Sequence, residues 1–382
     1  MLTGVAMSDL FDLKVGYLNF KNPVAVASMA GITDSTFFDN FPDAGLYILG
    51  GYSIDEATMK ASRELVKRDR KEFVSDDIFG LIESELKKVS GKGVAIGINV
   101  RATSPEPFLR AAELAKKYGA LLEINGHCRQ EEMTSLGAGE AMLTDRIALA
   151  RIVSEVKKTG VVVSLKMRTG VADDVLLCRI LEKAGLDIVH LDSMGMKGAN
   201  LNAVKKLRDS TGIFIIGNNS ITNYESAMAM CSAGSDMVSV ARAAMNDPKF
   251  IKGLVGYIED QQKQTGWYNA PSHICRGGDL RGLTWCCPPI KDCPVHHALG
   301  RTNLSAEKFA QIKLNFGKGT KLERGSSTCF GSMVWCCKFN KQCYLREDSM
   351  AENKLDSKEY NLLKKKLSEE IIRNIEKEKV VT

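Results

Sequence analysis

The sequence lacks any apolar run approaching the roughly 20 residues that a membrane-spanning helix needs. Its opening residues, MLTGVAMSDL, also lack the basic and then apolar pattern of a secretory signal peptide. Neither a membrane protein nor an exported protein is therefore indicated. We expect a soluble, cytoplasmic protein with no membrane partner.

Strong charge and a nucleotide-binding glycine motif are also missing. The net charge is +6 over 382 residues. This mild value permits an anionic substrate or a nucleic acid without requiring one, because faces that bind nucleic acid usually concentrate Lys and Arg. No strand–GxGxxG–helix unit appears, so the sequence gives no sign of a separate dinucleotide-binding domain.

Cysteine, by contrast, is plentiful, with 11 residues in the chain. Without export signals the thiols should stay reduced, which favours metal binding or catalysis over disulfides. Two similar segments, HICRGGDLRGLTWCCPPIKDC (273–293) and STCFGSMVWCCKFNKQC (327–343), each hold a first Cys, then WCC, then a further Cys. The two quartets are Cys275, Cys286, Cys287 and Cys293, and Cys329, Cys336, Cys337 and Cys343.

Four thiolates are the number that an iron–sulfur cluster or a tetrahedral zinc ion requires. We predict two iron–sulfur clusters of the 4Fe–4S type, because two residues normally separate the paired cysteines of a simple zinc ribbon. Zinc is the alternative, disulfides or scattered core thiols come third, and the eight cysteines can also be shared between the repeats. Cys178 and Cys231 fall on apolar faces of helical segments and are predicted to be core residues.

Eight short apolar runs alternate with helical segments between about residues 23 and 241. Parallel strands covered on both faces have this character, and helical segments such as PFLRAAELAKKYG end on Gly, a helix C-cap signal. Eight strands with intervening helices predict an α/β fold of the (β/α)8 TIM-barrel type rather than an open sheet. The predicted strands are 23–28, 45–50, 94–99, 120–125, 161–167, 187–192, 213–218 and 236–241.

Changes in composition along the sequence divide the chain into three parts. We predict the TIM barrel over residues 8–262, a duplicated Cys-rich metal-binding domain over 263–348, and a C-terminal helix over 349–382. The tail SKEYNLLKKKLSEEIIRNIEKEKVV mixes charges of both signs. This mixture favours a solvated helix that packs one stripe on the body over a nucleic-acid-binding arm.

Polar residues gather where the predicted strands end, and this is where TIM barrels place their active sites. Any one of these residues could equally serve as a polar cap at the end of a strand. The convergence of so many of them on one face of the barrel predicts a functional site. The stretch EINGHCRQ (123–130) adds a cysteine beside a histidine and an asparagine. The strand-end residues are Ser28, Asn99, Asn125, Lys166, Arg168, His190, Asp192, Asn218, Asn219 and Arg242.

Several longer motifs carry a family resemblance. ASMAGITD (27–34), SLGAGEAMLTDR (135–146), VSLKMRTGV (163–171), GNNSITN (217–223) and VARAAMNDPKF (240–250) resemble, in order, motifs of dihydrouridine synthases. Those enzymes are FMN-dependent barrels that reduce uridine in tRNA. NFKNPVAVAS (19–28) is similar to dihydroorotate and dihydropyrimidine dehydrogenases, whose barrels bind FMN in the same way. The duplicated WCC region resembles methanogenesis marker 9 proteins of methanogenic archaea, and barrel and tail together match that family best.

The resemblance implies an FMN site built from the strand ends. Lys166 would meet the N1/O2 edge of the flavin, where a cation stabilises the reduced anionic ring. Backbone N–H groups and an arginine in two loops would hold the phosphate. The implied cofactor-binding residues are Ser28, Met29, Ala30, Asn99, Lys166, Arg168, His190, Gly217, Asn218, Asn219, Ala241 and Arg242.

Cys128 matches the catalytic cysteine of these enzymes, and Asn125 matches the asparagine before it. When hydride reaches one carbon of a C=C bond, the neighbouring carbon needs a proton, and a thiol with a pKa of about 8.5 can supply it. A half-buried structural cysteine is the alternative. The sequence departs from the family pattern in having Arg129 where Pro is usual, and in having His127 directly before the cysteine. A protonated His127 would lower the thiol pKa and make Cys128 a nucleophile or a metal ligand instead.

Three functions follow. The first is an FMN-dependent oxidoreductase linked to methanogen metabolism, which passes electrons between two iron–sulfur clusters and flavin to reduce or oxidise a C=C bond. Its partners would be a small or cofactor-like substrate and an electron-donor protein. The second is a tRNA-dihydrouridine synthase, which is disfavoured because a Cys-rich repeat occupies the place of the helical RNA-binding domain. The third is a non-enzymatic scaffold that binds partners through the Cys-rich lobe.

Overall fold

The computed structural model of the chain describes residues 13–195, 198–211 and 213–265, and the isolated positions 354, 356, 359 and 373. Residues 12–258 form one compact unit. All eight cysteines of the WCC repeats, and most of the predicted terminal helix, lie outside the described residues. The predicted domain boundaries stay predictions.

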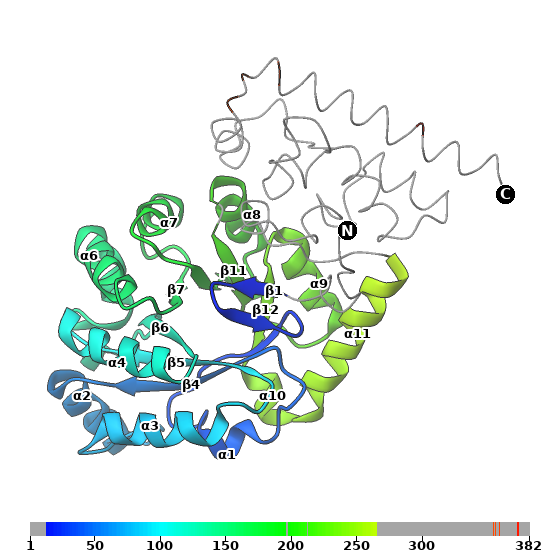
Figure 1. Cartoon of the computed structure of the whole chain (residues 1–382). Coiled ribbons are helices and arrows are strands. Elements are labelled where there is room, and N and C mark those ends of the chain that lie inside the picture. The colour runs from blue at the N-terminus through cyan, green and yellow to red at the C-terminus, as the bar shows by residue number, and fades with distance from the viewer. Residues whose placement is uncertain are drawn as a thin grey trace, which may run out of the picture. The chain divides into compact units, whose positions relative to one another are not determined.

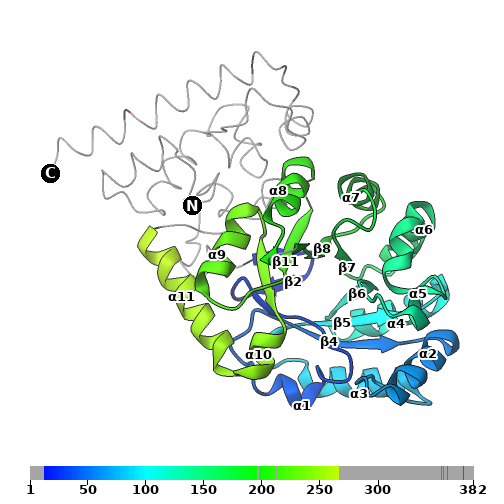
Figure 2. The same ribbon diagram turned by 180° about the vertical axis from the view of Figure 1, so that it is seen from behind.

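The compact unit is a closed barrel of parallel strands, as predicted (Figures 1 and 2). Each predicted strand has its counterpart, because each apolar run is long enough to be covered on both faces. The order around the barrel is β11-β12-β3-β4-β5-β6-β7-β8. The strands are β3 (Val24–Val26), β4 (Leu46–Ser53), β5 (Ala95–Arg101), β6 (Leu121–Gly126), β7 (Val163–Arg168), β8 (Ile188–Asp192), β11 (Phe214–Asn218) and β12 (Met237–Val240).

Helices surround the strands (Figure 1), and several begin at an Asp or Asn whose side chain accepts a hydrogen bond from the first turn, for example Asp55, Asp145 and Asn223. Such caps satisfy backbone N–H groups that the helix itself leaves without acceptors. The helices are α1 (Ser35–Phe38), α2 (Glu56–Lys67), α3 (Ile78–Val89), α4 (Pro105–Lys117), α5 (Glu131–Thr134), the 3-10 helix η2 (Gly139–Thr144), α6 (Arg146–Lys157), α7 (Asp174–Lys183), α8 (Leu201–Ser210), α9 (Tyr224–Ala233), α10 (Arg242–Asn246) and α11 (Lys249–Thr265).

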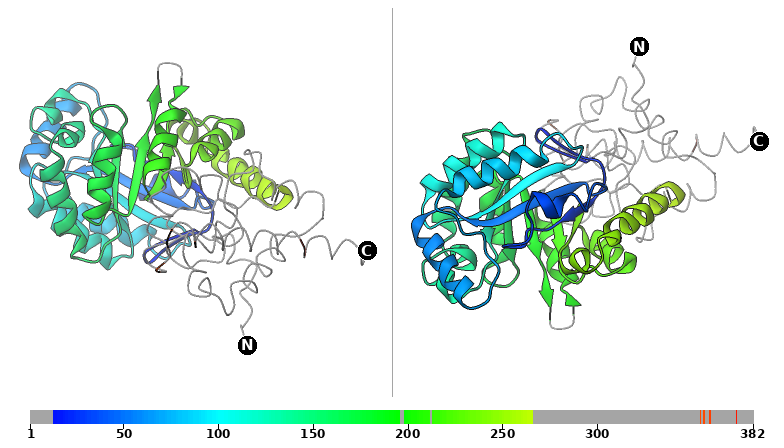
Figure 3. Two further views of the ribbon diagram at one scale, coloured as in Figure 1. Left: turned by 90° about the horizontal axis from the view of Figure 1, so that it is seen from above. Right: turned by 90° about the horizontal axis from the view of Figure 1, so that it is seen from below.

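The end of the barrel where the strands begin is filled with apolar side chains. An antiparallel hairpin of β1 (Leu13–Val15) and β2 (Leu18–Phe20) adds Val15, Leu18 and Phe20 to this cluster. The Phe20 ring lies 5.7 Å from the Phe214 ring. A second small hairpin, β9 (Met194–Gly195) with β10 (Gly198–Ala199), lies at the opposite end of the barrel (Figure 3).

In the half of the barrel nearer the C-terminal ends of the strands, here called the upper half, polar and apolar residues alternate along β5 to β8. In β6, the fully buried hydrophobic residues Leu122 and Ile124 alternate with the polar Glu123 and Asn125. Successive side chains of a strand point to opposite faces. One face of each strand therefore packs against the helices, while the other brings polar side chains into the barrel.

The two cysteines predicted to be core residues are indeed buried, Cys178 in α7 and Cys231 in α9. Burial raises the pKa of the Cys231 thiol to about 12 and that of Cys178 further. Both side chains therefore act as small hydrophobic residues. In the described part of the chain, no helix has both the length and the apolar character to cross a bilayer.

Candidate active site

Five of the predicted site residues come together inside the upper half of the barrel. Asn99, Asn125, Lys166 and His190 stand on the consecutive strands β5 to β8, and Asn218 stands on β11 beside β8. The strand register places Lys166 opposite both Asn125 and His190. At most 8% of the surface of Asn99, Asn125, Lys166 and His190 is exposed, so this is an interior site rather than a surface cluster.

Lys166 brings a buried positive charge to this interior. Its Nζ donates to the backbone oxygen and to Oγ of Ser28, both at 3.2 Å. Burial lowers the pKa of the Lys166 ammonium, and the nearby carboxylates of Glu123 and Asp192 oppose that effect. An ammonium has three N–H groups, so one is left for an acceptor of a bound molecule.

Two amides and a glycine form a shelf next to the residues that follow β3. Asn125 Nδ2 donates to Asn99 Oδ1 at 2.8 Å. A Cβ atom at Gly51 would lie 3.2 Å from Asn99 Oδ1, 3.5 Å from Asn125 Nδ2 and 3.9 Å from Ala30 Cβ. A side chain at position 51 would therefore crowd the amide pair, and glycine keeps this face of the amides free of one.

Below the shelf lies Glu123, a fully buried carboxylate that the sequence prediction missed. Its oxygens accept from Asn99 Nδ2 at 2.8 Å and Ser164 Oγ at 3.2 Å, and Oε2 lies 2.7 Å from His190 Nδ1. His190 Nε2 lies 2.7 Å from Ser239 Oγ, so both ring nitrogens have protein partners. The spacing along the strand could have predicted it, because Glu123 precedes Asn125 by two residues and therefore lies on the same face of the strand.

Cys128 follows β6, with its sulfur beside a buried arginine. Arg101 Nη1 donates to Cys128 Sγ at 3.6 Å. Arg101 is 2% exposed, forms an ion pair with Glu72, and donates through Nη2 to the Gly51 oxygen at 3.2 Å. The sequence prediction missed both Arg101 and Glu72, although Arg101 stands two residues after Asn99, on the same strand face.

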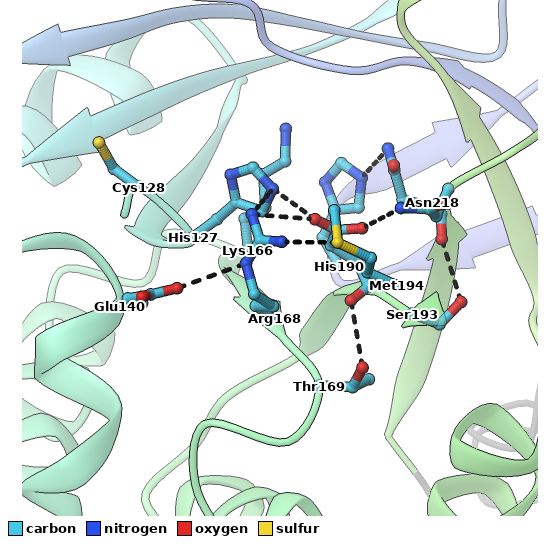
Figure 4. A network of polar contacts seen from close by, with 12 residues as sticks. His127, Cys128, Glu140, Lys166, Arg168, Thr169, His190, Ser193, Met194 and Asn218 are labelled. Atoms are coloured by element: carbon cyan, nitrogen blue, oxygen red, sulfur yellow. Dashed lines mark hydrogen bonds and ion pairs between the residues drawn. The ribbon is translucent and has the colours of Figure 1, made fainter. Parts of the chain in front are cut away.

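His127 does not act on the thiol as the sequence suggested. Its Nε2 lies 2.6 Å from Asp192 Oδ2, and Figure 4 shows the Cys128 sulfur apart from this contact. Burial lowers the pKa of His127 more than Asp192 raises it, which favours a neutral imidazole at pH 7. The cation beside the Cys128 sulfur is Arg101, because adjacent residues of the chain point in different directions here.

Asp192 and Arg168 both contact His127 at the mouth of the barrel, and Figure 4 shows Arg168 beside His127. Asn219 Nδ2 donates to Asp192 Oδ1 at 2.8 Å. Burial alone would raise the pKa of Asp192, but His127, Asn219 and Arg168 together hold it well below its usual range. Arg168 also forms an ion pair with Glu140 at 3.3 Å from Nε to Oε2. The cluster is thus a network of opposite charges in contact with one another.

The two predicted phosphate loops follow β11 and β12. Asn219 and its neighbour Ser220 have left-handed backbone conformations, with φ of 99° and 56°. A Cβ atom at Gly217 would lie 2.4 Å from atoms of Met230 and Ser235, so Gly217 serves close packing against α9. In the second loop, Ala241 is the N-cap of α10 and Arg242 is exposed.

A metal ion held by side chains needs several ligands close together among the residues that the structure describes. These residues contain no group of three or more His, Cys, Asp or Glu side chains arranged to hold a metal ion. The predicted ligands, the eight cysteines of the two quartets, lie outside them. The metal prediction therefore stays a prediction.

Comparisons with known proteins agree with the architecture. The family model for dihydrouridine synthase (Dus) matches residues 82–276, about half of the chain. Two uncharacterised proteins of Methanocaldococcus jannaschii are similar: one is 62% identical over 109 residues, which cover 28% of this chain and 70% of that protein. The other is 32% identical over 252 residues, which cover 63% of this chain and 94% of that protein.

A named bacterial relative is more distant. The tRNA-dihydrouridine synthase B of Proteus vulgaris is 26% identical over 260 residues, which cover 65% of this chain and 75% of that protein. The region that the family model matches includes β5 and β7, which carry Asn99 and Lys166, and the loop that holds Cys128. The chain is therefore a member of the dihydrouridine synthase family of flavin-dependent oxidoreductases.

Proposed function

We propose that the protein is an FMN-dependent oxidoreductase that reduces or oxidises a C=C bond. The observation that carries the proposal is the buried ammonium of Lys166 beside the amide shelf of Asn99 and Asn125, over which Gly51 places no side chain. A cation and amide groups on neighbouring strands suit the polar edge of a flat flavin ring. When bound, FMN supplies the hydride chemistry that side chains lack.

The residues that would hold FMN follow from these positions. Ser28, Met29 and Ala30 would flank the ring, while Lys166 and Asn99 would face its polar edge. Arg168 on β7 and His190 on β8 would contact the same cofactor. The phosphate would bind to backbone N–H groups of the loops Gly217–Asn219 and Ala241–Arg242, with the exposed Arg242 side chain as a counter-charge.

Cys128 would supply the proton that accompanies hydride transfer to the C=C bond. Asn125 Oδ1 accepts from the backbone N–H groups of His127 and Cys128, at 3.2 and 3.0 Å, and so fixes the loop. Arg101 would stabilise the thiolate left after the proton has gone. In the oxidising direction, the same thiolate takes the proton back.

For the electrons, we propose the two cysteine quartets as iron–sulfur centres, with zinc as the alternative. The support is the sequence: two sets of four cysteines in a repeat attached to a flavin-type barrel. The substrate would be a small or cofactor-like molecule linked to methanogen metabolism. The Cys-rich repeat stands where dihydrouridine synthases carry their RNA-binding domain, which favours such a substrate over RNA.

An anaerobic absorption and EPR spectrum, with flavin, iron and zinc quantified on the same sample, tests the cofactors. We expect one FMN and about eight iron atoms per chain. Stoichiometric zinc without iron would remove the electron-transfer role of the quartets. A protein that neither contains nor takes up FMN would overturn the proposal and favour a scaffold.

A tRNA-dihydrouridine synthase is the second candidate, favoured by the name and coverage of the Proteus vulgaris relative. A nucleoside profile of tRNA from a deletion strain separates the candidates. Lost dihydrouridine that the wild-type gene restores, and a Cys128→Ala variant does not, would assign the tRNA reaction. An unchanged profile would assign a different substrate.

A further inference from the structure

Glu123 lies where two hydrogen-bond chains meet inside the barrel. In the first chain, Asn125 Nδ2 donates to Asn99 Oδ1 and Asn99 Nδ2 donates to Glu123 Oε1, both at 2.8 Å. In the second chain, His190 Nδ1 lies 2.7 Å from Glu123 Oε2, and His190 Nε2 lies 2.7 Å from Ser239 Oγ.

The charge of Glu123 restricts the direction of both chains. Burial raises its pKa, but His190, Lys166 and Asn99 together hold the pKa below its ordinary value, so Glu123 is a carboxylate at neutral pH. An ionised carboxylate accepts hydrogen bonds and donates none. Each neighbour must therefore turn a donor toward Glu123.

The need for a donor toward Glu123 fixes the direction of each hydrogen bond up to the loop that holds His127 and Cys128. Asn99 turns its NH2 group to Glu123 and so presents its oxygen to Asn125. Asn125 turns its NH2 group to that oxygen and so presents its own Oδ1 to the loop. This Oδ1 accepts from the backbone N–H groups of His127 and Cys128. With either amide reversed, a donor would face these N–H groups instead.

The second chain is directed in the same way. His190 carries a proton on Nδ1, which points to Glu123. In the neutral ring, Nε2 then accepts from the Ser239 hydroxyl. Asn218 Nδ2 donates to Ser239 Oγ at 2.5 Å. Donors on both sides of the barrel thus point toward one buried anion.

We propose that Glu123 is a positioning residue, which fixes the donor direction of both chains and thereby holds the backbone of Cys128 at the mouth of the barrel. The importance of this for proton transfer rests on the proposed function. The direction of the chains does not, because it follows from the carboxylate and its partners alone.

The test is a rescue of one substitution by another. Asn99→Asp places a second carboxylate against Glu123, and two carboxylates in contact cannot both stay ionised. Repulsion should move the side chain of residue 99 away from Glu123 and break its contact with Asn125, so we expect amide hydrogen exchange at residues 127 and 128 of the full-length protein to speed up by about tenfold. Adding Glu123→Gln should reverse this effect, because the new amide donates to the carboxylate at position 99, which still accepts from Asn125.

The matched control is Asn99→Asp with Ser164→Ala. Ser164 also donates to Glu123, but its removal leaves both carboxylates in place, so it should rescue nothing. If Asn99→Asp alone fails to fold, recovery of folded protein on adding Glu123→Gln becomes the readout. The proposal would be overturned if the double variant Asn99→Asp, Glu123→Gln showed the same fast amide exchange at residues 127 and 128 as Asn99→Asp alone. Failure of both variants to fold would overturn it as well.

Hydrogen exchange needs neither flavin nor turnover. A protein that binds no FMN would therefore overturn the proposed function while leaving the rescue experiment interpretable. A failed rescue in a protein that binds FMN would remove the role of Glu123 alone.

Discussion

At the scale of single residues, Cys128 shows that the residues around a side chain in space can differ from its neighbours in the sequence. The sequence puts His127 next to it, but the structure gives its sulfur the guanidinium of Arg101. Arg101 is in turn paired with Glu72, in the segment between α2 and α3. Such a contact between distant segments carries no sequence period, so no pattern in the chain could have predicted it.

The first prediction concerns this arginine. Replacing both charges, with Arg101→Met and Glu72→Gln, should slow alkylation of Cys128 by iodoacetamide at pH 7 by about tenfold. The Arg101 guanidinium donates to the sulfur, and reactive cysteines lie beside such cations. Peptide mass spectrometry of the full-length protein measures the rate at Cys128 separately from the other cysteines.

Changing both partners avoids leaving Glu72 buried without its counter-charge. The matched control is Arg63→Met, because Arg63 pairs with the exposed Asp76 on the surface and should leave the rate at Cys128 unchanged. An unaltered rate in the folded double variant would show that Arg101 does not act on the sulfur.

At the scale of elements, the eight barrel strands were predictable because each is a short, mostly apolar run between helical segments. The hairpin of β1 and β2 was not, since strands of three residues are too short to show a period. The inward polar residues were only partly found. Lys166 and Asn125 matched known motifs, whereas Glu123 and Arg101 required the two-residue period to be followed along each strand.

The second prediction concerns the contact between β11 and α9. Gly217→Ala should destabilise the barrel by about 1–3 kcal/mol, because the added methyl group would overlap Met230 and Ser235. Urea unfolding followed by circular dichroism measures the change. Gly253→Ala is the control, since nothing lies within 4 Å of a Cβ there. In the helix α11 it should stabilise by up to about 1 kcal/mol. Equal effects at the two positions would contradict the packing role of Gly217.

At the scale of the whole molecule, the barrel was predictable and the chemistry of its tail remains a sequence prediction. The (β/α)8 fold follows from a count of strands, which survives small errors in their ends. Metal identity has no such redundancy, because iron–sulfur clusters and zinc use the same thiolates. Only measurement of the bound metal separates them.

The third prediction is that acid destabilises the whole barrel. The folded pKa values of His127, Asp192 and Glu123 all lie below their ordinary values. The unfolded chain therefore binds more protons as the pH falls, first at His127 below about pH 6.5 and then at the carboxylates below about pH 4. Each proton lowers the free energy of unfolding by at most about 1.4 kcal/mol per pH unit.

Urea unfolding at pH 7, 6, 5 and 4 tests this direction. His127→Gln should flatten the curve between pH 7 and pH 5 and leave the loss at lower pH, where the carboxylates titrate. A free energy of unfolding that stays constant or rises from pH 7 to pH 5 in the wild type would contradict the depressed pKa of His127.

The alternation along the upper strands also limits how this protein can evolve. Lys166 faces the site while Leu165 and Met167 pack in the apolar core. Deletion of the residue before Lys166 would exchange the two faces, turning the ammonium toward the helices and Met167 toward the site. Substitutions at the barrel mouth can accumulate one at a time, whereas a change in strand length would dismantle the site and the core together.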